Sequence, residues 1–390
     1  NREFVDLDFR WVLETDIKSR TRPAELAMVE RTTNGNFYGY IVGVKEDGNE
    51  LTTDLHPALK RVLARANALS AQANDLQKGD IGRINYQLER LRLKERRAEL
   101  DDKLTDQLKA ELASERQALN DRYQVLEKEL FSLRSQADRD AITVKDMRGE
   151  LVTMPMSKVL DVVWPNDMSL PAKVGHWFHQ IGKFVSDDPR EANTEGGVFP
   201  AIFGTVFMVL LMAIIVTPFG VVAAIYLHEY AGDNAITRLV RIAVINLAGV
   251  PSIVYGVFGL GFFVYMVGGS IDALFYPEAL PSPTFGAPGV IWSALTLALL
   301  TLPVVIVSTE EGLSRIPAAL RQGSLALGAT KAETLWRIVI PMASPAIMTG
   351  LILAIARAAG ETAPLMLVGV VKMAPALPID GNFPYVHLDR

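Results

Sequence analysis

Two charged residues interrupt an apolar stretch near the carboxy-terminal end of the chain. Arg357 and Glu361 lie within "ILAIARAAGETAPLMLV", residues 352–368, which holds no other charge. Residues four apart share one face of a helix, one turn apart, and this pair has no net charge. A lone charge at the centre of a membrane helix costs roughly 2.5–3.5 kcal/mol, so we expect both side chains to face a bundle interior or a wet path. Two roles stay open: a structural ion pair that locks helices together, or an anion contact by Arg357 that Glu361 holds in place.

A second stretch has the composition of a docking surface. The segment "RIPAALRQGSLALGATKAETLWRIVIPMASPAI" predicts a short helix at 317–326, a turn at Gly328 and a second helix at 331–339. Glycine suits a tight turn or a close approach between backbones. The small residues of this segment leave little side-chain bulk on its surface: Gly323, Ser324, Ala326 and Ala329. Such a surface fits a groove on another protein; an ordinary helical hairpin on a membrane surface is the alternative.

The bulk composition divides the chain into two halves that suit different solvents. The 390 residues are 49% hydrophobic, and the mean hydropathy is +0.20. Only nine of the 39 Lys and Arg residues and ten of the 44 Asp and Glu residues lie in 196–390. This split predicts a polar domain at 1–195 and a membrane domain at 196–390. The net charge of −5 gives no basic surface for nucleic acid, and a sequence without cysteine excludes disulfides and thiolate metal sites.

Four stretches of the second half are long enough to cross a bilayer. A membrane helix needs about 20 apolar residues, and charge-poor stretches of that length predict spans at about 198–227, 242–268, 290–309 and 343–371. In a soluble core, four such helices would leave almost no polar face. We therefore expect an all-α polytopic membrane domain, with Arg357 as the only Lys or Arg within these predicted spans.

The charges of the connecting loops predict the orientation of these spans. The loops at 228–241 and 310–340 hold arginines and lysines, whereas the loop at 272–289 holds none. The positive-inside rule then places the first two loops in the cytoplasm and the third outside, so residues 1–195 are expected to be extracytoplasmic. Because the chain opens on a polar stretch with no signal peptide, we expect at least one spanning helix upstream, and we expect the chain to continue past its polar carboxy-terminal end.

The polar half predicts an α+β domain with a coiled-coil helical hairpin. Leu112, Leu119, Leu126 and Leu133 recur every seven residues, which is a heptad pattern over about four heptads. Two antiparallel helices within about 57–138, joined where "QKGDIG" (77–82) predicts a break, would bury this seam. Strand-like segments lie on both sides, "NFYGYIVGV" before the hairpin and "AITVKD" and "ELVTMPMSKVLDVVWP" after it. They predict a small β-rich base.

His176 and His179 are the candidate metal ligands of the polar half. They lie three residues apart beside Trp177, and we expect the end of a surface helix here rather than a metal site. The chain shows no other cluster with metal-ligand spacing, so no metal is expected.

The docking segment resembles the "EAA" loop of ABC-importer permeases, whose short coupling helix docks into the ATP-hydrolysing subunit. Gln322-Gly323-Ser324 takes the place of the family's Glu-Ala-Ala, Gly328-Ala329 matches its glycine, and Ile340-Pro341 matches its trailing apolar–proline pair. The change from Glu to Gln removes a charge that in the family usually faces the loop or its partner.

Four further stretches narrow the resemblance to the permease subunits of Pst-type phosphate ABC transporters, closest to the A subunits. They are "AIYLHEYAG" (224–232), "NLAGVPSIVYGVFGLG" (246–261), "STEEGLSRIP" (308–317) and "ARAAGETAPLML" (356–367). Together with the docking segment they cover about 198–372. Residues 1–195 have no counterpart in this resemblance, because the family's ordinary members have a short loop there.

The resemblance implies a type I ABC importer permease core, MetI-like, in the bacterial inner membrane. Of the five helices of such a core, this chain would lack the last. A second homologous permease subunit would complete the pore, a nucleotide-binding ATPase homodimer would dock at the coupling loop 310–340, and an extracytoplasmic phosphate-binding protein would deliver the substrate. The chain itself would be no enzyme and bind no cofactor. It contains no GxxxxGK[ST] phosphate loop, so ATP is expected on the partner subunit.

One departure from the family pattern bears on the substrate. The family usually has a basic residue before its "TTEE"-like stretch, and here that place is Val307. If that residue lines the anion path, this chain has lost it or moved it to the partner, which favours Arg357 as an anion contact.

Two alternatives stay open. The first is a permease for another oxyanion or an organic solute. The second is an envelope receptor or scaffold with a coiled-coil sensor, although such a receptor needs a cytoplasmic output domain and only short loops are expected here. The insert at 57–138 either contacts the binding protein, the cell wall or another envelope protein, or is a solvated spacer.

Overall fold

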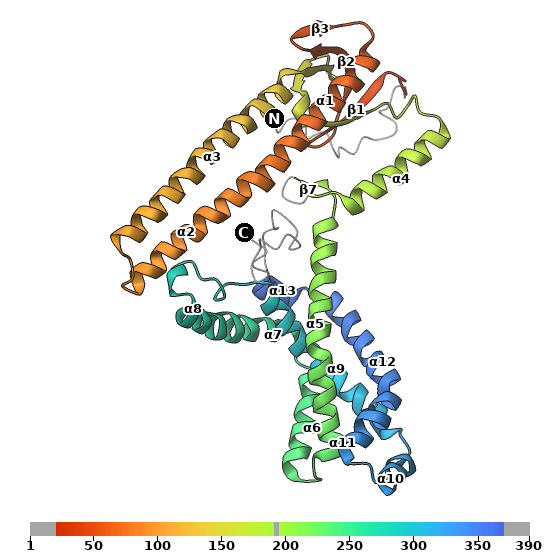
Figure 1. Cartoon of the computed structure of the whole chain (residues 1–390). Helices are drawn as coiled ribbons and strands as arrows, with labels where there is room; N and C mark the ends of the chain where they lie inside the picture. Colours follow the sequence, from red (N-terminus) through yellow and green to blue (C-terminus); the bar gives the residue numbers. More distant parts are fainter. Residues whose placement is uncertain (1–20, 191–194, 370–390) are drawn as a thin grey trace. The chain divides into compact units, whose positions relative to one another are not determined.

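The chain divides into two compact units, Asn1–Pro200 and Ala201–Arg390. The computed structural model (Figure 1) describes residues 21–190 and 195–369. The division lies close to the composition boundary predicted at 195. The polar carboxy-terminal stretch and the end of the predicted fourth span lie outside the described residues.

An antiparallel sheet forms the base of the first unit. Within the described residues it holds six strands in the order β5-β4-β2-β1-β6, with β3 paired to β2. The strands are β1 (Leu26–Arg31), β2 (Phe37–Glu46), β3 (Asn49–Leu51), β4 (Ala141–Lys145), β5 (Leu151–Pro155) and β6 (Val159–Val163). The strand-like segments predicted on both sides of the helices coincide with β2, β4, β5 and β6. Because β4 pairs with β2 in an antiparallel register, the sheet brings the two ends of the long helical insert together.

The core of the first unit lies between this sheet and the first turns of α1 (Leu55–Asp75). Three buried residues at helical spacing, Leu59, Val62 and Ala66, pack against buried strand residues such as Val44 and Ile142. Each fully buried leucine, valine or isoleucine side chain contributes about 1.5–3 kcal/mol of transfer free energy. The amino-terminal part of α1 is therefore part of the base, and the rest of the helix projects from it.

The helical hairpin turns at a different place from the one predicted. A single helix runs through α1, a π-helical stretch η3 (Leu76–Ile81) and α2 (Gly82–Leu100), and the chain reverses before α3 (Asp106–Arg139). The predicted break at 77–82 is wrong. Glycine weakens a helix but does not end one without a proline or a cap, and the buried side chains of Ile81 and Ile84 hold this stretch in the helix. Thr105 instead caps α3 by accepting from the amide of Leu108 at 3.3 Å.

The side of α3 that carries the heptad leucines is the less exposed side. Leu112 and Ala137 are buried, and Leu119, Leu126 and Leu133 are half-buried, while most residues between them are exposed. α3 contacts both α1 and α2, and Figure 1 shows it running alongside them. The leucine seam therefore faces the neighbouring helix; a supercoiled coiled coil stays a prediction.

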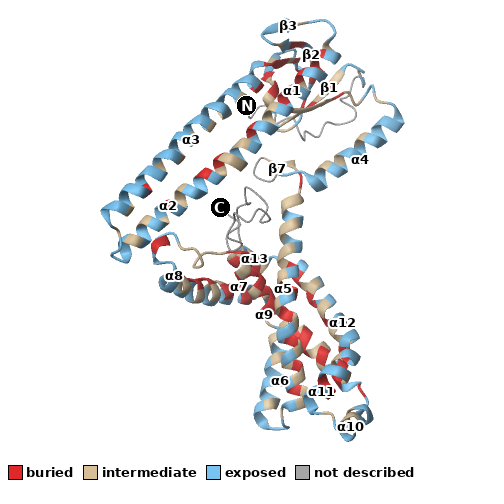
Figure 2. Ribbon diagram, viewed as in Figure 1, coloured by how far each residue is buried: buried red, intermediate tan, exposed pale blue. Residues whose placement is uncertain are grey.

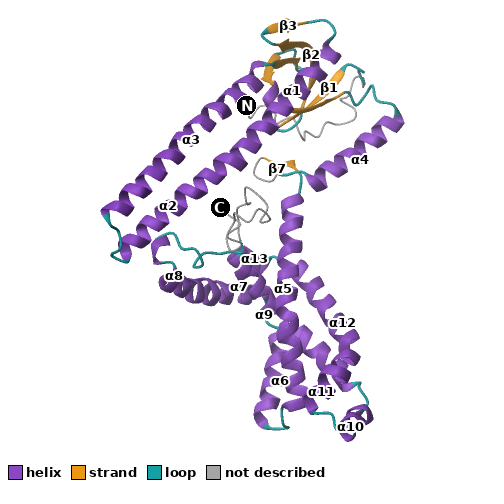
Figure 3. Cartoon of the chain, in the orientation of Figure 1, coloured by secondary structure: helices purple, strands orange, loops and turns teal. Residues whose placement is uncertain are grey.

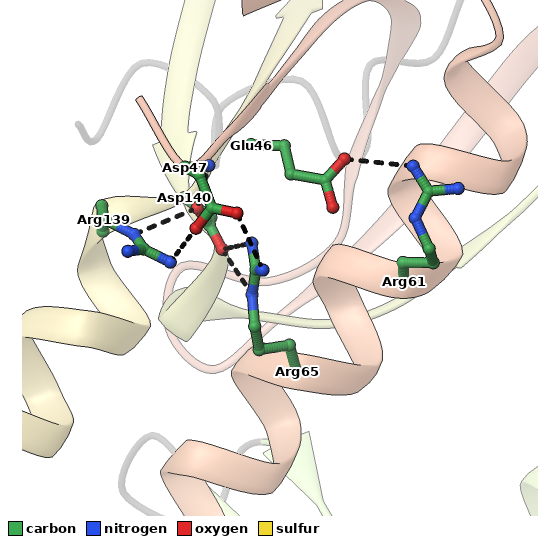
Figure 4. Close-up of polar contacts among 6 residues, drawn as sticks. All are labelled: Glu46, Asp47, Arg61, Arg65, Arg139 and Asp140. Atoms are coloured by element: carbon green, nitrogen blue, oxygen red, sulfur yellow. Dashed lines mark hydrogen bonds and ion pairs between the residues drawn. The ribbon is translucent and has the colours of Figure 1, made fainter. Parts of the chain in front are cut away.

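A buried carboxylate links the base of the hairpin to the sheet (Figure 4). Asp140, 2% exposed, follows α3 directly and accepts from the amide of Asp47 at 2.9 Å and from Arg65 Nη2 at 2.5 Å. Arg139 pairs with Asp47, and Arg61 Nη2 donates to Glu46 at 3.1 Å. A buried charge is tolerated only when it is paired and hydrogen-bonded, and both conditions hold for Asp140. The contacts join α1, α3 and the β2–β3 turn.

The second unit is built of helices in its described residues, whereas the strands lie in the first unit (Figure 3). Four helices are long and apolar enough to cross a membrane: Phe199–Tyr230, Ser252–Phe275, Val290–Ser314 and Lys331–Ala359. They are built from α5 (Phe199–Ile225) with η5 (Tyr226–Tyr230); α7 (Ser252–Phe258), η6 (Gly259–Gly268) and α8 (Gly269–Phe275); α9 (Val290–Ser314); and α11 (Lys331–Thr334), η8 (Leu335–Val339) and α12 (Ile340–Ala359). The shorter helices are α6 (Ala235–Leu247), α10 (Ala318–Ala326) and α13 (Ala363–Val368).

Two of the predicted spans are divided in the structure. The stretch predicted as one span at 242–268 breaks between α6 and α7, where Pro251 cannot donate to the helix ladder. The stretch predicted at 343–371 breaks at 360–362, between α12 and α13. The fourth candidate helix also begins upstream of the predicted span, at Lys331, and contains Arg337. Within the predicted span itself, 343–371, Arg357 stays the only Lys or Arg.

Helix α9 lies at the centre of the second unit. It contacts α12, α13, α7 and α6, and Figure 2 shows much of it buried. Glycines on the neighbouring helices let the backbones approach: a Cβ on Gly220 would lie 2.6 Å from Val305 Cγ1, and one on Gly350 would lie 2.7 Å from Ser308 Cβ. Small residues at such crossings drive helix association in membranes.

Candidate functional site

The Arg357–Glu361 pair lies at the end of a helix rather than within one. Gly360 ends α12, with its amide donating to the Arg357 carbonyl at 3.2 Å, and Glu361 follows as the first residue beyond. The Arg357 Nε to Glu361 Oε1 distance is 3.8 Å. The predicted one-turn spacing is therefore met, but the shared helix face is not, because Gly360 and the proline of α13 end one helix and begin another.

The surroundings of the pair join three helices. Ala354 and Ala358 of α12 belong to the same buried cluster as Tyr255 of α7. Tyr255 donates to the Leu247 carbonyl of α6 at 2.6 Å. The side chains of Arg357 and Glu361 are 31% and 20% exposed, so both reach the surface of this chain. Arg357 therefore extends from a helix that packs against its neighbours, while the charged groups of the pair are partly exposed.

The predicted docking segment forms two helices joined by a glycine turn. Gly328 has φ +89°, a backbone conformation that only glycine adopts without strain. Its amide donates to the Leu325 carbonyl at 3.0 Å, and the Ala329 amide donates to the Ser324 carbonyl at 3.2 Å. These two bonds are those of a Schellman motif at the end of a helix, so Gly328 sets the direction in which the chain leaves α10.

The second helix of the hairpin begins with a capping box. The Thr330 hydroxyl accepts from the Glu333 amide at 3.2 Å, and Glu333 Oε2 accepts from the Thr330 amide at 2.9 Å. Ser324 and Thr334 join the two helices through their hydroxyls at 2.8 Å. The turn is therefore fixed by local hydrogen bonds on both sides, and α10 and α11 form one rigid hairpin.

The predicted docking residues lie on the surface of this hairpin. Gln322, Gly323 and Gly328 are exposed, and Ser324 and Ala329 are half-buried. A Cβ on Gly323 or Gly328 would meet no atom within 4 Å, so the small residues leave open surface. The same surface carries exposed leucines that composition did not single out, with Leu327 90% exposed. It therefore combines small residues with apolar side chains that have no cover within this chain's described residues.

A half-buried glutamate ties the α10–α11 hairpin to the end of the first span. Glu229 of η5, whose side chain is 12% exposed, pairs through Oε1 with Arg321 Nη2 of α10 at 3.1 Å and with His228 Nδ1 at 3.0 Å. The Lys331 ammonium donates to the Glu229 carbonyl and lies 4.3 Å from the centre of the Tyr230 ring. Sequence reasoning missed this cluster, although "AIYLHEYAG" and the docking segment were each singled out. The opposite charges of Glu229 and Arg321 were the only sign in the sequence that these two segments are in contact.

Val307 and His176, the other residues that the sequence pointed to, make few polar contacts. Val307 is half-buried in α9, next to Ser308, whose hydroxyl donates to the Ala346 carbonyl at 2.9 Å. His176 lies 3.3 Å from Gln180 through Nε2. In residues 21–190 and 195–369, no three His, Cys, Asp or Glu side chains group as they would around a metal ion.

Residues 216–384 match the family described as the binding-protein-dependent transport system inner membrane component. The chain is also similar to the phosphate transport system permease protein PstA of Mycobacterium leprae, with 34% identity over 233 residues, 60% of this chain and 69% of that protein. The chain belongs to this family of inner membrane transport components. The hairpin, Glu229 and the Arg357–Glu361 pair all lie inside the matched residues.

Two other relatives are similar over more of this chain than the 216–384 that the family matches. PstA 1 of Mycobacterium tuberculosis is 36% identical over 217 residues, 55% of this chain and 64% of the relative. The probable PstA of Methanocaldococcus jannaschii is 32% identical over 189 residues, 48% of this chain and 60% of the relative. The chain thus spans about two thirds or less of the length of these curated relatives. With four apolar helices and this family, it is a multi-pass inner membrane protein.

Proposed function

We propose that this chain is a permease subunit of an ATP-driven inorganic phosphate importer and forms half of its translocation pore. The α10–α11 hairpin carries the proposal, because it is rigid, outward-facing and bound to the first span through Glu229. The relatives named as phosphate transport permeases support phosphate as the cargo. The chain is a transport subunit rather than an enzyme, and ATP binds and is hydrolysed on a partner.

The hairpin couples the ATPase to the membrane helices. Exposed small residues and leucines offer a surface that a groove on the ATPase subunit can take up. Because Arg321 of α10 and Lys331 of α11 both hold Glu229, a displacement of the hairpin pulls on η5. This stretch continues α5 without a break, so the displacement reaches the first span as a rigid-body movement.

Arg357 is the anion contact and Glu361 its resting partner. The guanidinium carries five donors in a fork that matches phosphate oxygens, and Glu361 Oε1 lies 3.8 Å from its Nε, beyond hydrogen-bond distance. α12 has 20 residues and is about 30 Å long, so Arg357 lies near the end of the span opposite to the coupling hairpin. A phosphate arriving at that end displaces Glu361 and takes over the guanidinium.

The orientation follows from where the positive charges lie. Arg241, Arg321 and Lys331 lie near one another around Glu229 and Leu227, at the coupling end of the spans. The positive-inside rule makes this the cytoplasmic end. The first unit, Asn1–Pro200, is then periplasmic.

The partners follow from this arrangement. A second homologous permease subunit supplies the other half of the pore. A nucleotide-binding ATPase homodimer docks at α10, and an extracytoplasmic phosphate-binding protein delivers phosphate to the Arg357 end.

Uptake of radiolabelled phosphate by a strain without its own copy of this subunit tests the proposal. The wild-type chain and Arg238→Gln should restore uptake, because Arg238 is an exposed arginine of α6 whose ion-pair partner Asp233 is 4.0 Å away. Arg357→Gln should lose uptake while the protein stays in the membrane. If sulfate uptake depends on this chain and phosphate uptake does not, the cargo is another oxyanion and the proposal is wrong.

A further inference from the structure

Helix α4 (Leu170–Ser186) packs onto its own unit with its polar face. None of its residues is buried, and the three that are partly covered are His176, Gln180 and Lys183, spaced four and three apart. Lys183 Nζ pairs with Glu30 Oε2 of β1 at 3.2 Å. A helix on the surface of a soluble domain turns its apolar stripe toward the core, so the arrangement of α4 is the reverse of the expected one.

The apolar face of α4 is exposed along its whole length. Seven large apolar side chains lie within about one third of the helix circumference on a wheel of 3.6 residues per turn: Leu170, Val174, Trp177, Phe178, Ile181, Phe184 and Val185. Each is exposed, with Leu170 at 78% and Phe178 at 63%, and Figure 2 shows α4 pale blue along most of its length. A continuous apolar stripe of this kind marks a contact with a membrane or a protein.

The carboxy-terminal end of α4 is joined to the start of the first span. The amide of Val198 donates to the Phe184 carbonyl at 2.8 Å, and β7 (Pro189–Arg190) pairs with β8 (Glu195–Gly196). The joint is tight, because Gly196 has φ +87° and a Cβ on it would lie 2.6 Å from the Asp188 carbonyl oxygen. The apolar span begins at Phe199. The last turn of α4 therefore lies at the point where the chain enters the bilayer.

We propose that α4 is an interfacial helix whose apolar face lies in the lipid leaflet at the amino-terminal end of α5. Helices of this kind lie in the membrane plane with the apolar side about 5–10 Å into the boundary between headgroups and acyl chains. Trp177 and the two phenylalanines suit this depth, because aromatic side chains concentrate at the membrane–water boundary. The helix gives the first unit a second attachment to the bilayer besides α5.

The chemistry of the stripe favours lipid over a protein partner. The indole N–H of Trp177 is its only polar side-chain group, whereas protein interfaces carry about one hydrogen bond per 100–200 Å². Acyl chains require no such partners. Lys173 lies beside Phe184 at one edge of the stripe on the helix wheel and is exposed, where a long basic side chain reaches back to headgroup phosphates.

A chain without cysteine allows a direct test by site-directed spin labelling. The full-length protein carries a single Phe178→Cys or Ile181→Cys label on the stripe, or a Phe131→Cys label as the control. Phe131 is a 73% exposed apolar residue on α3 and lies outside the proposed contact. Each protein is reconstituted into vesicles of phosphatidylethanolamine with a minority of phosphatidylglycerol. Collision rates with oxygen, which partitions into lipid, and with a water-soluble nickel chelate are then measured.

The proposal expects the oxygen-to-nickel ratio at positions 178 and 181 to be several-fold above that at 131. A label at 178 that is as open to the nickel chelate as the label at 131 would overturn it. Low collision rates with both reagents would also overturn it, because the stripe would then be covered by protein. Using two stripe positions keeps the test valid if one variant does not fold.

Discussion

At the scale of single residues, the charges of the second unit form two centres with different chemistry. Glu229 is enclosed by Arg321, His228 and the Lys331 ammonium. Arg357 and Glu361 share one longer contact at a partly exposed position. Several close contacts at a half-buried group give rigidity, whereas a single loose pair can exchange its partner. The first centre therefore suits a rigid connection between the α10–α11 hairpin and the first span, and the second suits a binding site.

Glu361→Gln separates a substrate contact from a helix lock. Because a long, partly exposed ion pair contributes up to about 1 kcal/mol, losing it should change the KM for phosphate by up to about fivefold, toward tighter binding as Arg357 is released. The amount of protein in the membrane should stay the same. Glu361→Asp, which keeps the charge, is the control in uptake assays. Disappearance of Glu361→Gln from the membrane would instead assign the pair a structural role.

Glu30 makes the attachment of α4 dependent on pH. Burial raises the pKa of Glu30, but the hydrogen bond from Arg190 and the charge of Lys183 outweigh it, so the pKa lies below its usual range. A carboxyl with a lowered pKa stabilises the fold above its unfolded pKa, and this contribution is lost as the pH falls through the folded pKa. We expect Glu30→Gln to cost about 1–3 kcal/mol near neutral pH and little in acid. Hydrogen exchange of β1 amides across pH measures this difference, and equal losses at both pH values would contradict it.

At the scale of elements, the shape of the coupling hairpin depends on the backbone of Gly328. Valine and asparagine are similar in volume, but asparagine tolerates a left-handed backbone and a β-branched residue does not. Gly328→Val should strain the turn by about 1–2 kcal/mol and lower phosphate uptake, while Gly328→Asn should keep most of it. Both variants add bulk at the same open surface, so the comparison isolates the backbone. Immunoblots of membranes check insertion, and equal uptake by both variants would refute this role of the turn.

Sequence patterns predicted those elements whose signals are local. The helix–turn–helix of the coupling hairpin and the leucine seam of α3 were predicted because their residues lie within a few turns of one another. The two glycines of "QKGDIG" were misleading, since Ile81 and Ile84 pack away from solvent and keep the helix continuous. Gly360 did end a helix, because Pro364 follows it. The contact between Glu229 and Arg321 depends on tertiary packing that one sequence does not reveal.

At the scale of the whole molecule, the two units differ in their relation to the matched family and have separate cores. The family match begins at residue 216, so the first unit lies outside it. The first unit also has its own core between α1 and the sheet. We therefore expect the permease unit to insert and assemble even if the far end of the α1–α3 helical hairpin is changed. A test must spare the base, because deleting the whole of 60–138 would also remove the core residues Val62 and Ala66.

Two cross-helix contacts show where the hairpin can be shortened. Arg134 Nη2 donates to Gln77 Oε1 at 2.6 Å, and Arg116 Nη2 donates to Glu95 Oε2 at 2.5 Å, so residues 77 and 134 face each other. Replacing 80–131 with a short glycine turn removes the far part and keeps the cluster between α1 and the sheet. The shortened chain should reach normal membrane levels and retain phosphate uptake in the complemented strain. Loss of uptake by a chain that still inserts would mean that the far part of the hairpin binds a partner that transport requires, because the core of the unit and the permease helices are unchanged.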